Sequence, residues 1–159
     1  METDVRFLTA QDAYKVLMRD YIAPRLRELG FKGSGREFWL SSELFWAGIG
    51  FQASAWSDKS AVQFTVNIQV VEKDRWAELV TSRPDRKYPE RPAANNSYSS
   101  RVAWATRIGE LMDGQDHWWS TRGVANLAAL AEDVVREIRD RALPEMRRRM
   151  TGQPSRLRS

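Results

Sequence analysis

The stretch LFWAGIGFQASAW at 44–56, followed by AVQFTVNIQVV at 61–71, decides the fold of this chain. In both segments large apolar residues alternate with small or polar ones, the period-two pattern of a β-strand with one buried face. The apolar positions are Phe45, Ala47, Ile49, Phe51, Ala53 and Ala55 in the first segment, and Val62, Phe64, Val66, Ile68 and Val70 in the second. Residues 57–60 form a short connection, so we expect an antiparallel pair.

The flanking sequence extends this pair into an α+β domain. The alternation begins near residue 36, which predicts a third antiparallel strand before the turn at Ser41 and Ser42. A short helix at 72–80 and a long loop at 82–100, rich in Pro, Ser and Asn, are expected before a fourth strand at 101–108.

Apolar residues at intervals of three and four predict two amphipathic helices, one at 9–29 and one that runs from residue 124 and ends before Pro144. Pro24 should break or kink the first helix near Ala23. The GSG at 33–35 is expected to form a plain turn. The predicted fold class is therefore α+β, with an antiparallel sheet of about four strands packed against an N-terminal and a C-terminal helix.

The charge of the chain is concentrated at its end. The chain has 159 residues and a pI of about 9.7. Five of its 25 lysines and arginines lie from Arg147 onward, where no acid occurs, so the remaining 20 nearly balance the 21 acids. We expect a single domain over 1–146 and a disordered basic tail over 147–159. The near-neutral body makes nucleic acid an improbable partner.

The composition excludes several kinds of chemistry. The chain has no cysteine and one histidine, which rules out disulfides, thiolate metal sites, a cysteine nucleophile and a multi-histidine site within one chain. We expect neither a metal nor a cofactor. The acidic start and the lack of any apolar run of membrane-spanning length predict a cytoplasmic protein that is not inserted in a membrane.

The opposite face of the two central strands carries neutral side chains. No charged residue occurs at 44–57 or 60–71, whereas a solvated strand face usually presents Lys and Glu. The pattern indicates a face shielded from water, either by a loop of the same chain or by a second subunit of a homodimer. A groove for a small molecule or a protein partner is the functional alternative. Single-stranded nucleic acid stacking on Trp46 and Trp56 is disfavoured, because few basic residues lie nearby.

The segment GQDHWWSTRG at 114–123 holds the one histidine of the chain. We expect Asp116 to cap a short helical turn by accepting from the backbone of Trp118 or Trp119, and we expect the two rings to close one end of the core. Catalysis by His117 would require a positioned partner and a nucleophile, and no nucleophile motif accompanies it.

Several segments in order resemble the bacterial family named domain of unknown function 4304. They are APRLRELGF at 23–31, GFQASAW at 50–56, FTVNIQV at 64–70, RIGEL at 107–111, DHWW at 116–119 and ALP at 142–144. The resemblance implies importance without an assigned role for Asn67, Arg107, Asp116, Trp118 and Trp119. The position of His117 is free in that pattern, which further disfavours catalysis by this residue.

Together these features predict a non-catalytic binding module that uses the neutral sheet face to bind a small molecule or a protein partner. The alternative is a small enzyme of specialised metabolism with a proton-transfer group among Glu110, Asp116 and His117. The expected ligand-binding residues are Trp46, Gln52, Ser54, Trp56, Thr65, Asn67, Gln69, Arg107, Asp116, Trp118 and Trp119.

Overall fold

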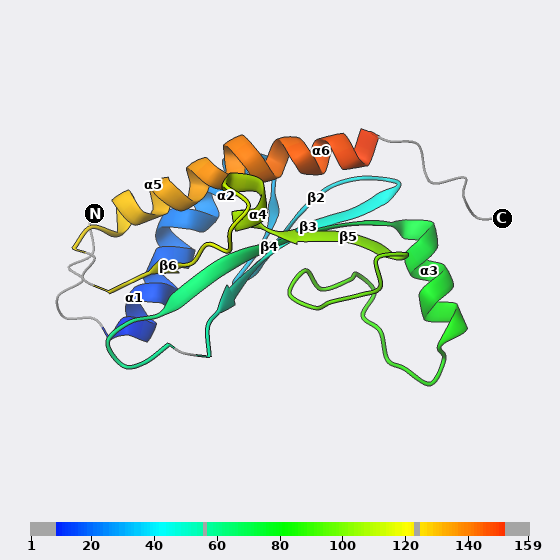
Figure 1. Cartoon of the computed structure of the whole chain (residues 1–159), viewed down its shortest axis with the longest axis horizontal. Helices are drawn as coiled ribbons and strands as arrows, with labels where there is room; N and C mark the ends of the chain where they lie inside the picture. Colours follow the sequence, from blue (N-terminus) through cyan, green and yellow to red (C-terminus); the bar gives the residue numbers. More distant parts are fainter. Residues whose placement is uncertain (1–8, 56, 123–124, 152–159) are drawn as a thin grey trace.

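An antiparallel sheet with helices on one of its faces forms the protein (Figure 1). The computed structural model describes residues 9–55, 57–122 and 125–151. The strand order is β1-β2-β3-β4-β5, and β6 also pairs with β4. The strands are β1 (Lys32–Ser34), β2 (Glu37–Leu40), β3 (Phe45–Ala53), β4 (Gln63–Glu72), β5 (Ala103–Arg107) and β6 (Trp119–Ser120). The predicted α+β class and antiparallel sheet are confirmed, and β1 and β6 are additional short strands.

Strand β1 shows that the expected GSG turn belongs to a hairpin. Ser34 in β1 pairs with Glu37 in β2, which leaves Gly35 and Arg36 as the turn. Gly35 has a φ of 67°, a left-handed conformation that suits glycine at such a position. The hairpin brings Arg36 to the end of the sheet where the sites described below are found.

Strands β5 and β6 lie along the same edge of β4. Arg107 at the end of β5 pairs with Asn67, and Trp119 at the start of β6 pairs with Phe64. The helix α4 (Ile108–Met112) and the residues that follow it therefore leave this edge and return to it. Period-two alternation does not predict such an insertion, because β6 contains two residues.

The two helical arms cover one face of the sheet, and α3 (Lys73–Ser82) follows β4 at its far end (Figure 1). The N-terminal arm consists of α1 (Ala10–Val16), a π-helical segment (Leu17–Ile22) and α2 (Ala23–Glu28). The C-terminal arm consists of α5 (Leu127–Glu137), a π-helical segment (Ile138–Ala142) and α6 (Leu143–Thr151).

The prolines do not end either arm, so the predicted helix end before Pro144 is wrong. The interruption expected near Ala23 takes the form of a π-helical segment. The Ala23 N–H donates to Met18 O, and the Leu143 N–H donates to Ile138 O. Each bond spans five residues rather than four. This wider turn absorbs the ring and the missing N–H of the proline that follows it.

Because the C-terminal arm continues, α6 takes in the first part of the expected basic tail. Met146 is fully buried and Met150 packs against the core. Arg148 and Arg149 bind Glu145, and these hydrogen bonds, led by that from Arg148, lower the pKa of the Glu145 carboxyl to about 2. The helix α6 therefore continues to Thr151, and residues 152–159 lie outside the described part of the chain.

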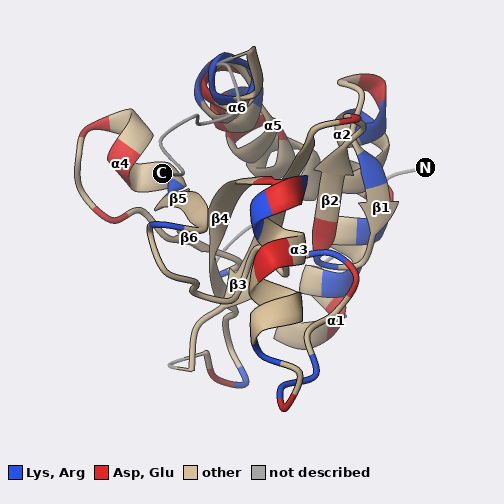
Figure 2. Cartoon of the chain, turned by 90° about the vertical axis from the view of Figure 1, so that its right-hand side faces the viewer, with Lys and Arg blue, Asp and Glu red and all other residues tan. Residues whose placement is uncertain are grey.

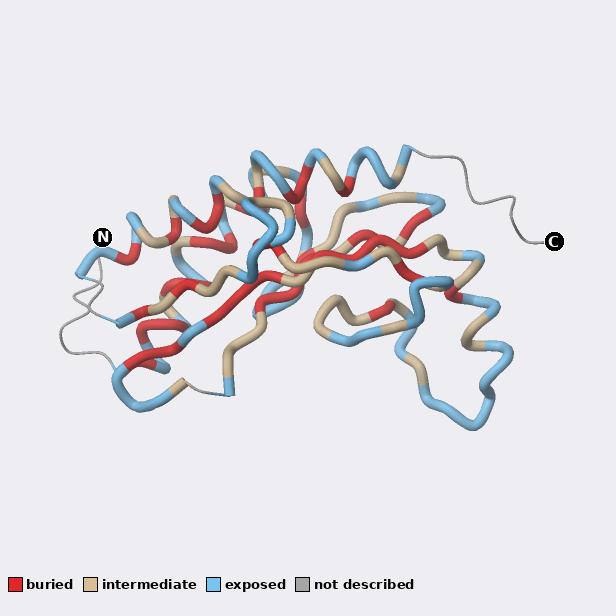
Figure 3. Tube along the Cα trace, viewed as in Figure 1, coloured by how far each residue is buried: buried red, intermediate tan, exposed pale blue. Residues whose placement is uncertain are grey.

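The main core lies between the helical arms and the sheet, where the buried segments of Figure 3 meet. Phe64 of β4 is fully buried, and its ring contacts Tyr14, Phe51 and Trp119 with centroid separations of 5.2, 6.4 and 5.8 Å. Charged residues lie on the helices, on the loops and on the strands β1 and β2 (Figure 2). Within the described ranges, no helix is both long and apolar enough to cross a membrane.

Gly109 in α4 tests whether the inserted segment is tightly packed. A Cβ at this position would overlap the carbonyl oxygen of Gln115 and lie 2.6 Å from His117 N. Alanine normally stabilises a helix relative to glycine, but Gly109→Ala should lower Tm by at least about 3 °C, equivalent to about 1 kcal/mol in a chain of this size. Calorimetric unfolding measures this shift.

Glu110→Ala is the matched control, because Glu110 is exposed in the same helix. Its Tm should stay close to that of the wild type. A Gly109→Ala protein as stable as the wild type would show that the inserted segment moves aside without cost.

Candidate functional site

The neutral sheet face is covered by a loop of the same chain. Residues 83–102 pass across this face, on the side opposite α5 and α6 (Figure 1). The Gln69 amide nitrogen lies 3.4 Å from the carbonyl oxygens of both Ala93 and Asn96, and Asn95 Nδ2 donates to Phe51 O at 3.1 Å. Of the covers considered above, the chain's own loop is therefore the one found.

Gly50 allows this loop to approach the sheet closely. A Cβ built on Gly50 would overlap the side-chain amide of Asn95. Gly50 also stands opposite Asn67 in the pairing of β3 with β4. The missing side chain on β3 therefore makes the space in which the amides of Asn67 and Asn95 meet.

An aromatic cluster around Trp76 holds the part of the loop that includes Tyr88, Glu90 and Tyr98. The Trp76 ring meets Tyr88 and Tyr98 edge-on, with centroids 5.5 and 5.0 Å apart, and its Nε1–H donates to Glu90 O at 3.1 Å. Val71 and Ala103 are buried in the same cluster. This second small core explains how a segment without helix or strand keeps its place.

Trp46 already has cationic neighbours from the same chain. Lys73 Nζ lies 4.3 Å from its ring centroid, and the Arg91 guanidinium lies 5.5 Å from it and 3.6 Å from the Trp39 centroid. These contacts fix the loop to the edge of the sheet through cation–π attraction. The other expected platform residue, Trp56, lies outside the described residues.

Asn67 is the centre of the polar network beneath the loop. Its Nδ2 donates to Gln52 Oε1 at 2.8 Å and to Asn95 Oδ1 at 2.9 Å, and its Oδ1 lies 3.4 Å from Arg107 Nε. Both amide hydrogens of Asn67 are thus used within the chain. The network orients Gln52 and Asn95 and leaves no donor on Asn67 for a ligand.

Asp116 closes the base of the α4 insertion. Its Oδ2 accepts from Arg107 Nη1 and from Trp118 Nε1, both at 2.9 Å, and the Arg107 guanidinium lies 5.3 Å from the Trp118 ring centroid. The expected backbone cap is therefore wrong, because side chains from both ends of the insertion bind this carboxylate. The ion pair is about half exposed, so it contributes geometry more than stability.

The remaining residues of the DHWW segment form part of the core wall. Thr65 Oγ1 donates to His117 O at 2.7 Å, and the His117 ring meets Trp119 edge-on at 4.6 Å. Trp119 is buried, which confirms that it closes one end of the core, whereas Trp118 is only half-buried. Ser54 comes directly after β3, and its N–H donates to Gln63 O.

The three proton-transfer candidates do not converge. Glu110 is exposed on α4, and Asp116 is bound by Arg107 and Trp118. Within the described part of the chain, no ion pair links His117 to either acid, and no group of three or more histidine and acidic side chains could hold a metal ion.

One part of the neutral face stays open as a polar cavity, here called the amide pocket. It has a volume of about 570 Å³. Its walls come from the β1–β2 hairpin, the end of β3 and the covering loop. The lining residues are Ser34, Arg36, Glu37, Gln52, Ala53, Ala93, Asn95 and Asn96.

Among the residues that the structure describes, Gln52 is the one expected ligand-binding residue that lines the amide pocket. Asn95 and Asn96 were not among the predicted site residues. The only sequence feature that pointed to these two residues was the composition of the 82–100 loop. An asparagine pair in a long loop is compatible with contact to a neutral sheet face, but it does not identify the position that the pair contacts.

Replacement of Asn67 tests whether the network holds the loop. Asn67→Leu should remove the hydrogen bonds of Asn67 to Gln52, Asn95 and Arg107 and lower Tm by about 3–8 °C, since an unmade buried hydrogen bond costs about 1–3 kcal/mol. Trypsin should also cut faster in the 83–102 loop, where Arg86, Lys87 and Arg101 are cleavage sites not followed by proline.

Gln63→Leu supplies the control. It makes the same kind of change at an exposed position on the same strand and face. Equal Tm values and equal cleavage rates for the two variants would show that the loop does not depend on Asn67.

Comparisons with known proteins place the chain in a family. No curated protein and no solved structure was found to match it. The model of the family described as Domain of unknown function (DUF4304) matches residues 22–148, most of the chain, which confirms the resemblance carried by the RIGEL and DHWW segments. The chain therefore belongs to the DUF4304 family.

Proposed function

We propose that this protein is a non-catalytic binding module whose ligand is a small polar molecule held in the amide pocket. The observation that supports the proposal is that the 83–102 loop covers the neutral sheet face but leaves one end of that face open. At this end Gln52, Asn95 and Asn96 line a cavity of about 570 Å³, a size in the usual range for small-molecule sites.

The amides of the pocket are oriented before any ligand arrives. Asn67 donates to both Gln52 Oε1 and Asn95 Oδ1, so each side-chain amide is fixed with its oxygen toward Asn67. The Gln52 NH2 group donates no hydrogen bond within the described residues and is available to an acceptor on a ligand. Such preorganisation lowers the conformational entropy lost on binding.

The charges at the pocket favour a neutral or zwitterionic ligand. Arg36 and Glu37 contribute one positive and one negative side chain to the walls. Neutral amides supply both donors and acceptors. Free amino acids, their primary amides and dipeptides have this combination of groups, and they are the first molecules to test.

The test is a titration of the isotope-labelled protein with this panel, followed by NMR of the side-chain amides. A ligand should shift the NH2 signals of Gln52, Asn95 and Asn96. Gln52→Leu should weaken binding about tenfold or more, since losing one buried hydrogen bond costs about 1–3 kcal/mol.

Gln63→Leu is the control for this titration, because Gln63 does not line the pocket. It should bind like the wild type. No response of the pocket amides at about 10 mM ligand, where even a millimolar site is mostly filled, would refute the proposal. Equal affinity of the Gln52→Leu protein would also refute it.

A further inference from the structure

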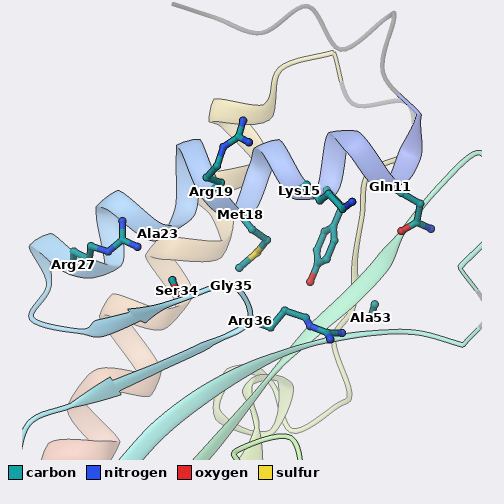
Figure 4. A pocket seen from close by; sticks show the side chains of 11 residues that line it. Gln11, Lys15, Met18, Arg19, Ala23, Arg27, Ser34, Gly35, Arg36 and Ala53 are labelled. Carbon is teal, nitrogen blue, oxygen red and sulfur yellow. The ribbon is translucent and has the colours of Figure 1, made fainter.

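A second cavity, here called the helix pocket, lies between the N-terminal helical arm and the β1–β2 hairpin. Its volume is about 660 Å³. Figure 4 shows Met18 projecting from the helix toward the hairpin, with Arg36 on the opposite side. The pocket shares Ser34, Arg36 and Ala53 with the amide pocket but includes none of its amide side chains.

The floor of the helix pocket is apolar. Tyr14, Met18 and Ala23 line it and are each at least nine-tenths buried. This floor gives an apolar ligand a surface already removed from water. The large hydrophobic side chain that stands exposed among the described residues is Leu44, which does not line the pocket. The apolar surface is thus confined to the hollow, which suits a small molecule better than a membrane or a protein face.

The rim of the helix pocket is positively charged. Lys15, Arg19, Arg27 and Arg36 all line it, whereas no acidic side chain of the described residues does. Arg19 is paired with Asp20 at 2.7 Å, and Arg27 donates to Gly33 O at 3.0 Å. Within the described residues, Lys15 and Arg36 form no ion pair. These two cations are therefore available to an anion.

Tyr14 places an unused polar group in the wall of the same pocket. Its hydroxyl is buried and has no hydrogen-bond partner among the described residues, an uncommon state for a buried polar group. Burial raises the pKa of Tyr14 to about 12, although the positive charge of Arg36 acts in the opposite direction. At neutral pH the hydroxyl is therefore protonated and can donate.

We propose that the helix pocket binds a small amphipathic organic anion, a carboxylate carried on an apolar body. The apolar body packs against Tyr14, Met18 and Ala23. The carboxylate lies beside Arg36 and Lys15 and accepts a hydrogen bond from the Tyr14 hydroxyl. This site does not depend on the proposed function of the amide pocket, because Gln52, Asn95 and Asn96 take no part in it.

Calorimetric titration of the full-length protein with dodecanoate tests the proposal. Dodecanol, used below its solubility limit, is the uncharged comparison, and dodecyltrimethylammonium is the cationic one; both ionic compounds are used below the concentration at which they form micelles. Dodecanoate should bind with a stoichiometry of one and at least tenfold more tightly than either comparison.

Two substitutions identify the groups that bind the carboxylate. Arg36→Gln should weaken dodecanoate binding about tenfold or more, and Tyr14→Phe about three- to tenfold. Tyr14→Phe removes only an unpartnered hydroxyl, so the Tm of this variant should not fall, and weaker binding cannot then result from unfolding. Arg136→Gln is the control, because Arg136 lies on α5, pairs with Asp133 and does not line the pocket, and this variant should bind like the wild type.

The outcomes separate this proposal from that for the amide pocket. Equal binding of dodecanoate and dodecanol, no measurable binding of dodecanoate, or unchanged binding in both Arg36→Gln and Tyr14→Phe would overturn the helix pocket. None of these results depends on the Gln52 and Asn95 amide signals. If those signals do not shift while dodecanoate binds normally, only the proposal for the amide pocket is overturned.

Discussion

The pairing of β3 with β4 sets the position of every other part of this structure. It runs without interruption from Phe45 opposite Glu72 to Ala53 opposite Phe64. On one face this register places Ile49 beside Ile68, both fully buried beneath the helical arms. On the other face it places a glycine beside a long amide side chain. A slip of one residue would exchange the two faces and bury the amides in the main core.

The glycines of β3 determine what can cover the second face. Gly50 stands opposite Asn67 and Gly48 opposite Gln69, so each amide of β4 has an empty position beside it. The loop residues Asn95 and Ala94 occupy these positions. A side chain on β3 would hold the loop away from the sheet, and the polar network would open to water. The neutral composition of the face is thus explained by contact with backbone and amide groups of the same chain.

The RIGEL and DHWW segments owe their residue types to the insertion at the edge of β4. Arg107 and Trp118 lie at its two ends and share the carboxylate of Asp116. Ile108 is fully buried, and Gly109 leaves room for the backbone of Gln115. Arg107, Ile108, Gly109, Asp116 and Trp118 therefore each have a role in returning the chain to the sheet. His117 contacts the core through its backbone oxygen and through the edge of its ring. Any residue type supplies the backbone oxygen, and several side chains could replace the ring contact in part.

The sequence was sufficient to predict strands and helices that keep one apolar period over many residues. It was insufficient to predict features whose position depends on contacts between segments far apart in the chain. Alternation predicted β3 and β4, and helical spacing predicted both arms, because each buries one face over many residues. The helix end predicted before Pro144 was wrong because a π-helical turn accommodates a proline within a continuous helix. A hydrogen bond that spans five residues produces no periodic pattern in the sequence. The absence of charge on 44–57 and 60–71 indicated a covered face. It could not indicate the cover, because the position of Asn95 against Gly50 depends on how a 20-residue loop without periodicity folds back.

The same limitation applies to the two pockets, since both are formed where the β1–β2 hairpin meets other segments. Arg36 lies in the turn of that hairpin and lines both cavities. Its charge is shared between them, so an anion that binds Arg36 in the helix pocket leaves Glu37 as the uncompensated charge of the amide pocket. Binding in one cavity would then alter affinity in the other, and this effect is reciprocal because each ligand would shift the same side chain. The two proposed sites would therefore be linked through Arg36, although the amides of one pocket and the Tyr14 hydroxyl of the other remain separate groups.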